Sequence, residues 1–155
     1  MDNLFMARAV KLSIENVQSG RGGPFGAVIV RHGAIIAESA NQVTLTNDPT
    51  AHAEMLAIRN ACKKLGAFDL GECAIYASSE PCPMCLGAIY WARLSKIYFA
   101  NSAADAANYG FDDSMIYSEF TKPSGRRKIP MDQIMREQAL EAFRAWEASP
   151  NKITY

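Results

Sequence analysis

Hydrophobic and polar positions recur along this chain with two different periods, and the periods predict its helices and strands. Near the N-terminus, buried-type residues recur at steps of three and four, which predicts a helix with one buried face. These residues are Phe5, Met6, Ala9, Val10, Ser13 and Val17. Glycines at positions 20, 22 and 23 then end the pattern. The apolar segments 27–30 and 33–37 predict two strands joined by a short turn.

The middle of the chain repeats a strand and helix pattern. Capping residues at 47–50 predict the start of a helix that ends near Gly66. Its expected buried face comprises Met55, Ile58, Cys62 and Leu65. Segment 73–77 predicts a third strand, 84–93 a short helix and 96–100 a fourth strand. This order indicates parallel pairing with right-handed crossovers, so that helices cover both faces of the sheet.

The last third of the chain has weaker patterns. Residues 101–128 are loop-rich, 133–136 predict a fifth strand, and a final helix is expected to bury Leu140, Phe143 and Trp146. No repeat or linker interrupts the 155 residues, a length usual for one domain. We therefore expect a single α/β domain over 1–155, with three layers and a mixed sheet of about five strands.

Composition narrows the classes of partner. Sixteen basic and sixteen acidic side chains cancel, which argues against a large nucleic-acid footprint. No apolar run is long enough to span a membrane, and the N-terminus has no signal-peptide pattern. Two of the four cysteines form a Cys-x-x-Cys, which suggests metal or redox chemistry in a reducing compartment. We expect a cytoplasmic protein without a membrane partner.

Two short motifs, His52-Ala53-Glu54 and Pro81-Cys82-Pro83-Met84-Cys85, each stand at the start of a predicted helix. Two cysteines in one helical turn can direct both sulfurs at one ion, and the free amides of that helix N-terminus stabilise thiolates. His52 can supply a third ligand from the neighbouring helix. Three protein ligands leave a zinc position open for water, which is typical of a catalytic site. The sequence predicts one catalytic Zn²⁺ per chain.

Glu54 is the predicted catalytic residue. Two thiolates and a neutral imidazole cancel the charge of zinc, so a nearby base must help to take a proton from the attacking water. Glu54 lies two residues beyond His52 and can deliver that proton to a ring nitrogen and then to the departing amine. A thioredoxin-like dithiol is the redox alternative, but it leaves His52 and Glu54 without a role.

The combination H-x-E…P-C-x-x-C is the signature of zinc-dependent deaminases. Beyond it, the stretches 22–28, 47–54, 80–93 and 110–114 resemble the bacterial guanine deaminases of the cytidine deaminase superfamily. The resemblance runs along nearly the whole chain. It implies a cytidine deaminase-like fold, hydrolysis of guanine to xanthine and ammonia, and a homodimer whose C-terminal tails, residues 150–155, are exchanged between subunits.

The same resemblance implies a purine pocket beside the zinc group. Its residues would be Phe25, Asn41, Ala53, Trp91, Asp113 and Tyr155. An amide can donate to the O6 or N7 acceptor of guanine, and a carboxylate can accept from its ring N–H. Each position also has a structural alternative: Asn41 as the end of a strand, Phe25 and Trp91 as core, and Asp113 as part of a solvated turn.

Other functions remain open at this point. A tRNA adenosine deaminase would use the same zinc site but must hold an RNA backbone, for which 122–128 offers the candidate basic segment. The alternative for that segment is an exposed loop. Guanosine, other aminopurines or aminotriazines are further candidate substrates. A non-catalytic zinc-binding scaffold is the non-enzyme alternative, and the presence of Glu54 argues against it.

Overall fold

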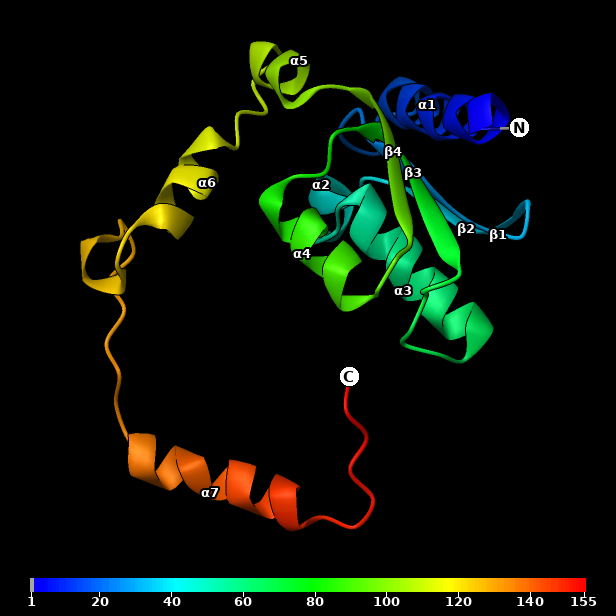
Figure 1. The fold of residues 1–155 in the computed structure, drawn as a ribbon. Coiled ribbons are helices and arrows are strands. Elements are labelled where there is room, and N and C mark those ends of the chain that lie inside the picture. The colour runs from blue at the N-terminus through cyan, green and yellow to red at the C-terminus, as the bar shows by residue number, and fades with distance from the viewer. Residues whose placement is uncertain (1) are drawn as a thin grey trace. The chain divides into compact units, whose positions relative to one another are not determined.

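The computed structural model describes residues 2–155, and the unit that ends at Asp113 contains a mixed four-stranded sheet with the strand order β2-β1-β3-β4 (Figure 1). Strand β1 (Gly26–Arg31) is antiparallel to both β2 (Ala34–Ala40) and β3 (Cys73–Ser79). Strand β3 pairs in parallel with β4 (Lys96–Asn101). Strands β2, β3 and β4 therefore run in the same direction, and β1 is inserted between the first two. The expected parallel β3-helix-β4 unit is confirmed.

Five helices belong to the same unit as the sheet, which ends at Asp113. They are α1 (Asp2–Gln18), α2 (Val43–Thr46), α3 (Ala53–Leu65), α4 (Pro83–Trp91) and α5 (Ala103–Asn108). Helix α3 connects β2 to β3, and α4 connects β3 to β4. None of the helices within residues 2–155 is both long enough and apolar enough to cross a membrane.

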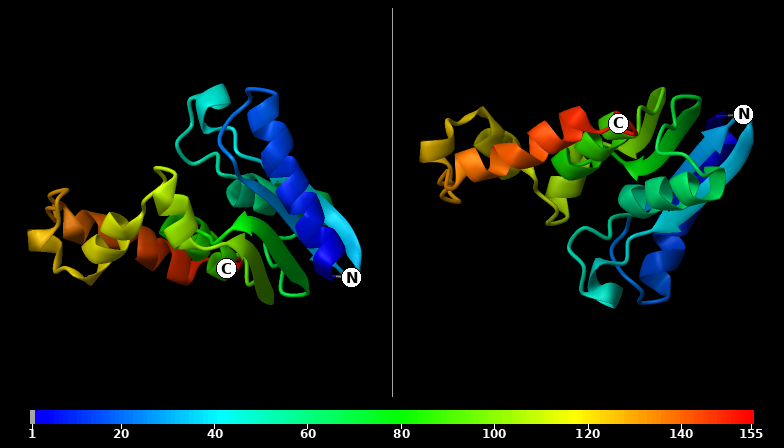
Figure 2. Two further views of the ribbon diagram at one scale, coloured as in Figure 1. Left: turned by 90° about the horizontal axis from the view of Figure 1, so that it is seen from above. Right: turned by 90° about the horizontal axis from the view of Figure 1, so that it is seen from below.

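The sheet has a hydrophobic core on each face, as the alternation along β1 requires. Ala27 and Ile29 pack in the cluster that includes residues of α3 and α4. Val28 and Val30 pack in the other cluster, together with Ala9 of α1. Helix α1 thus covers one face, and α3 and α4 cover the other (Figure 2). The expected three-layer arrangement is confirmed for this unit.

Only the C-terminal end of α3 agrees with the expected capping, because none of the residues at 47–50 is the N-cap. His52 is the N-cap in extended conformation, and Gly66 is the C-cap with a φ of 64°, a left-handed conformation that suits glycine. The buried face differs in detail from the prediction. Among the expected residues only Ile58 is buried, and the other buried residues of α3 are Glu54 and the alanines at 53, 57 and 61. Small side chains allow the helix to lie close to the sheet.

Residues 114–155 form a second unit with α6 (Ser114–Thr121), a 3-10 turn η1 (Ser124–Arg126) and α7 (Arg136–Ala148). The expected fifth strand at 133–136 is wrong. Residues 131–135 have no regular structure, and Met135 has a φ of 53°, which interrupts extended backbone. Segment 101–128 is more regular than expected, because it contains α5, α6 and η1.

The apolar face of α7 is exposed in the isolated chain. Phe143 and Trp146 were expected in a core, yet 71% and 44% of their surfaces are accessible, and Leu140 is half-buried. The helix itself is confirmed, whereas burial of its apolar face by this chain is not. Periodicity indicates that a helix has an apolar face, but it does not say which surface covers that face.

Candidate active site

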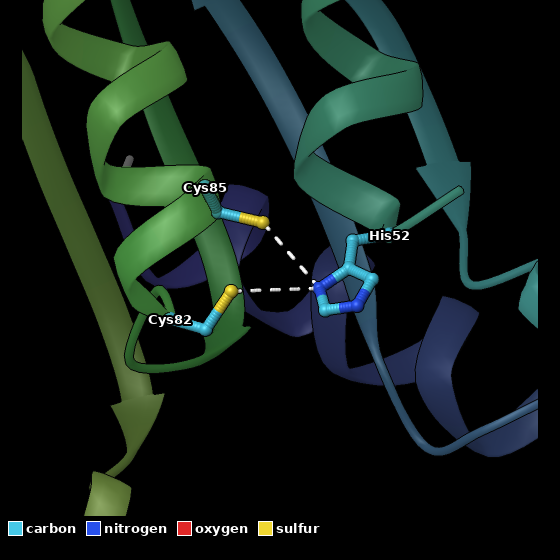
Figure 3. A group of neighbouring side chains, drawn as sticks. All are labelled: His52, Cys82 and Cys85. Carbon is cyan, nitrogen blue, oxygen red and sulfur yellow. Dashed lines mark hydrogen bonds between the residues drawn. The ribbon is translucent and has the colours of Figure 1, made fainter. Parts of the chain in front are cut away.

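Three metal-binding side chains from the two motifs meet at the N-termini of α3 and α4. The Nδ1 atom of His52 lies 3.6 Å from Sγ of Cys82 and 3.5 Å from Sγ of Cys85 (Figure 3). The ligand atoms of all three lie within 4.8 Å of one another. The sequence-predicted ligands are therefore brought together, with Nδ1 as the histidine nitrogen that faces the sulfurs.

This spacing fits zinc. Bonds of about 2.3 Å to sulfur and about 2.0 Å to nitrogen, at a tetrahedral angle, separate these two atoms by about 3.5 Å. The two sulfur–nitrogen distances agree with that value. Two thiolates and one imidazole are also ligands that zinc prefers, and three of them leave one position of a tetrahedron open. The donor set and its geometry both match a catalytic zinc site.

Local backbone structure explains why the ligands converge. His52 and Cys82 are both helix N-caps, and Pro83 occupies the first position of α4, where its missing N–H removes no helical hydrogen bond. The loop before His52 is ordered by Asp48, whose Oδ1 accepts hydrogen bonds from the backbone N–H and hydroxyl of Thr50. Both helix N-termini therefore direct backbone N–H groups and positive dipole ends toward the ligands, and the Cys85 N–H donates to the Cys82 sulfur.

The electrostatics of the site favour a negative charge on Cys82 even without a metal. The pKa of Cys82 is lowered to about 4, chiefly because Cys85 donates a hydrogen bond to it, and His52 contributes another. The same hydrogen bond and burial raise the pKa of Cys85. The pKa of His52 is raised, mainly by its hydrogen bond with Cys82. Before a metal binds, the three ligands thus share protons, and a cation displaces those protons.

Glu54 lies in the first turn of α3 with only 7% of its surface accessible. Its carboxyl group interacts with Cys85, and burial is the main cause that raises its pKa. A buried carboxyl group beside a metal site can hold a proton at a pH where an exposed one could not. This environment suits the predicted proton transfer, which stays a prediction.

Asn41 and Phe25 are held together at the entrance of the loop that leads to His52. Asn41 is buried, its backbone N–H donates to the carbonyl of Phe25 at 3.0 Å, and its Oδ1 accepts from Val43 N–H at 3.2 Å. Because Oδ1 is used in this way, Nδ2 is the group that Asn41 can offer to a ligand. Phe25 packs partly against the core and partly edge-on against Phe111, with ring centroids 4.9 Å apart.

Asp113 is half-buried at the end of the loop that contains Phe111. Its pKa is raised first by burial and next by the negative charge of Cys82. That electrostatic interaction indicates that Asp113 lies near the metal-binding cysteines. The role of Asp113 in substrate binding stays a prediction.

The remaining predicted pocket residues differ in their surroundings. Ala53, the first residue of α3, is fully buried directly after His52. Trp91 ends α4 and is 68% exposed, so the alternative of a core tryptophan is wrong. Tyr155 belongs to the second unit and is exposed. The roles of Trp91 and Tyr155 in substrate binding stay predictions.

Two polar residues of interest were not predicted from the sequence. Asn16 of α1 is buried and donates hydrogen bonds to the carbonyls of Gly23 and Asn41. Its signal was present, because Ala9, Ser13 and Asn16 continue one helical stripe at steps of four and three. Ser79, at the end of β3, is buried, and its Oγ has no hydrogen-bond partner among residues 2–155. No pattern in the sequence distinguishes that serine.

Comparison with known proteins places the chain among zinc-binding deaminases. The family described as the cytidine and deoxycytidylate deaminase zinc-binding region matches residues 1–101. The chain is 57% identical to guanine deaminase of Bacillus subtilis over 97% of both proteins. It is 37% identical to tRNA-specific adenosine deaminase of Aquifex aeolicus over 76% of both.

A crystal structure gives the same result for the fold. The X-ray structure of Bacillus subtilis guanine deaminase superposes with a TM-score of 0.96 at 56% identity, over 99% of this chain and 98% of the other. The family match covers every metal-binding residue and Glu54. The chain belongs to the cytidine and deoxycytidylate deaminase family of zinc-binding proteins.

Proposed function

We propose that this protein catalyses the zinc-dependent hydrolytic deamination of guanine to xanthine and ammonia. The observation that carries the proposal is the buried carboxyl group of Glu54 beside the cluster of His52, Cys82 and Cys85. A structural zinc site needs no such acid. The identity to a guanine deaminase, 57% over nearly the full length, supports guanine as the substrate.

His52, Cys82 and Cys85 would hold the zinc, which when bound supplies an acidified water molecule as the nucleophile. Glu54 accepts the proton of that water as it adds to C2 of guanine. Glu54 delivers this proton to the adjacent ring nitrogen. It then takes the second proton from the added hydroxyl group and passes it to the amine, which leaves as ammonia while C2 becomes a carbonyl carbon. The raised pKa of Glu54 helps it to hold each proton between accepting it and passing it on.

The base would be held beside this group by the predicted pocket. The Nδ2 of Asn41 donates to an acceptor of guanine, and the Asp113 carboxylate accepts from a ring N–H. Phe25, held against Phe111, offers an aromatic surface to the purine. Ala53, at the N-terminus of α3, offers a backbone N–H. Trp91 and Tyr155 would complete the enclosure.

A tRNA adenosine deaminase is the alternative within the family, since such a relative is 37% identical. The basic segment 122–128 gives it little support. Lys122 forms an ion pair with Glu119, and the Lys128 backbone N–H also donates to Glu119. The charge of Lys122 is thus neutralised locally by Glu119. Guanosine, other aminopurines and aminotriazines are the alternative small substrates.

We further propose that the 155 residues act as one domain whose tail, 150–155, is exchanged in a homodimer. The exposed apolar face of α7, with Phe143 and Trp146, supports this proposal because such a face is stabilised by burial against a partner. We place the enzyme in the cytoplasm. The Cys-x-x-Cys pair at the proposed zinc site supports this placement, because a reducing compartment keeps such thiols available for a metal.

The proposed activity is tested by a release assay for ammonia with guanine, guanosine, adenine, cytosine, cytidine and a tRNA anticodon stem-loop. We expect guanine to have the highest kcat/KM and xanthine to be its product. Preference for the stem-loop or for cytidine contradicts the proposal. A protein that binds zinc but releases ammonia from none of these substrates would instead be a scaffold.

A further inference from the structure

Asn16 makes two hydrogen bonds that connect α1 to two segments of the proposed base pocket. Its Nδ2 donates to the carbonyl of Gly23 at 2.9 Å and to the carbonyl of Asn41 at 2.8 Å. Only 5% of the residue is accessible. Both hydrogens of one amide nitrogen therefore bridge two carbonyls that lie far apart in the sequence.

The two carbonyls belong to a closed set of backbone contacts around Phe25. Phe25 N–H donates to the Gly23 carbonyl at 2.9 Å, and Asn41 N–H donates to the Phe25 carbonyl at 3.0 Å. The packing here leaves no spare room. A Cβ on Gly22 would lie 2.5 Å from the Asn41 carbonyl oxygen and 3.1 Å from Asn16 Nδ2. A small shift of Asn16 is therefore transmitted to both pocket segments.

The same set of contacts reaches the loop that bears the metal ligand. Gln42, the residue after Asn41, donates from its backbone N–H to the Ala51 carbonyl at 2.9 Å, directly before His52. Asn41 Oδ1 is held by Val43 N–H. The orientation of the Asn41 amide thus depends on a backbone segment whose ends are tied to α1 and to the His52 loop.

We propose that Asn16 is a positioning residue that sets the Asn41 amide and the Phe25 ring for binding of the purine base. This inference rests on the proposed function. Asparagine is a poorer helix former than alanine, yet it occupies a buried position in α1. A bridge between two carbonyls requires a side chain with two N–H donors on one nitrogen, which alanine, serine and aspartate all lack.

The test compares Asn16→Ala with Ser13→Ala. Ser13 is also buried in α1, and among residues 2–155 its hydroxyl donates to the Val10 carbonyl of the same helix. We expect Asn16→Ala to raise KM for guanine about tenfold and to weaken xanthine binding similarly, with smaller loss in kcat and normal zinc content. Ser13→Ala should leave KM unchanged. Equal KM values for the two variants overturn the inference.

A double-mutant cycle makes the test specific. In an Asn41→Ala background, where the oriented amide is absent, the effect of Asn16→Ala on KM should fall to about twofold or less, through the Phe25 segment alone. A full tenfold effect in that background means that Asn16 does not act through Asn41. Asn16→Ser, which keeps one donor, replaces Asn16→Ala in both comparisons if the alanine variant does not fold.

The wild-type activity distinguishes failure of the proposed function from failure of the positioning role. If the wild-type protein does not deaminate guanine, the function itself is wrong and the role of Asn16 in it falls as well. If wild type is active and Asn16→Ala has the KM of Ser13→Ala, the function stands and only the positioning role is wrong.

Discussion

Nδ1 of His52 lies 3.5 Å from Sγ of Cys85, although 33 positions separate the two residues in the chain. The contact joins the first turns of α3 and α4, which lie on the same face of the sheet. Because the two helices follow different strands, only the crossover topology brings these atoms together. The sheet topology thus assembles the metal site.

Cys85→Ala tests the ligand assignment. We expect about one zinc per wild-type chain and almost none in the variant, because a two-ligand site binds zinc far more weakly and a Cys82 thiolate would lose its counter-charge. Metal content by inductively coupled plasma spectrometry measures this. Cys62→Ala, which removes a free thiol outside the cluster, is the matched control and should retain zinc. Stoichiometric zinc in Cys85→Ala would falsify the assignment.

Glu54→Gln separates metal binding from proton transfer. The amide keeps the size and polarity of the side chain but cannot carry a proton, so kcat should fall by about 10²–10⁴-fold while zinc content stays normal. Steady-state guanine turnover and metal analysis measure the two effects. Glu141→Gln, an exposed position of α7, is the control and should be fully active. Near-normal activity of Glu54→Gln means that another group moves the proton.

Removal of the tail tests the proposed exchange between subunits. Deletion of Ile153–Tyr155 should leave zinc content and folding nearly unchanged but sharply lower guanine turnover, because the tail is proposed to close a pocket and exclude water. Mixing the truncated chain with Glu54→Gln is the sharper measurement. If tails are exchanged, a mixed dimer combines an intact Glu54 site with a full tail, and some activity returns. No recovery in mixed dimers contradicts the exchange.

The ion pair between Arg8 of α1 and Glu38 of β2 predicts a pH dependence of stability. The Arg8 guanidinium donates two hydrogen bonds to the carboxylate, and this interaction is the main reason that the pKa of Glu38 is lowered. A lowered carboxyl pKa contributes stability above its unfolded value, and the contribution is lost as pH falls through the folded pKa. Since both side chains are about one-third exposed, we expect about 1 kcal/mol or less.

Glu38→Gln measures this contribution. At neutral pH the variant should be less stable than wild type in urea unfolding, and the difference should disappear at a pH below the folded pKa, where Glu38 is protonated in both states. Glu72→Gln is the matched control, because the ion pair between Glu72 and Arg31 is more exposed to solvent than the pair between Glu38 and Arg8. A Glu38→Gln difference that is equal at both pH values means that the ion pair does not cause it.

Ser79→Ala should stabilise the metal-free protein. The Ser79 hydroxyl is buried at the end of β3 without a hydrogen-bond partner among residues 2–155, and an unsatisfied buried polar group costs about 1–3 kcal/mol. Alanine removes that group with little change in volume. Ser78→Ala is the control and should destabilise, since Ser78 Oγ accepts a hydrogen bond from Gly26 N–H at 2.9 Å. An equal decrease in the free energy of unfolding for both substitutions contradicts this prediction.

Local sequence was sufficient for the parts of the molecule that depend on neighbouring residues. Periodicity and backbone preference predicted three such features. They are the buried face of α1, the turn between β1 and β2 at 31–34, and the C-cap of α3 at Gly66. The metal ligands were also predictable from local sequence, because few functions other than metal binding use a histidine and two cysteines at helix N-termini. The family resemblance extended this to candidate pocket residues.

Other features depended on contacts between distant segments. The insertion of β1 between β2 and β3 is not encoded in any local pattern, since strand pairing is decided by which faces must be buried. The predicted strand at 133–136 was wrong because Met135 has left-handed backbone, and Ile134 and Met135 remain exposed. The predicted burial of the apolar face of α7 is not confirmed, because a periodic pattern does not identify the surface that covers the helix.

The sequence by itself determined the chemistry of the metal group, because ligand type and helix-start position are local properties. Tertiary structure decided the surroundings of that group. The burial that raises the pKa of Glu54 and the bridge from Asn16 to Asn41 exist only once α1, the sheet and α3 are packed. Desolvation and hydrogen bonds between distant segments depend on three-dimensional proximity, which no local residue pattern specifies.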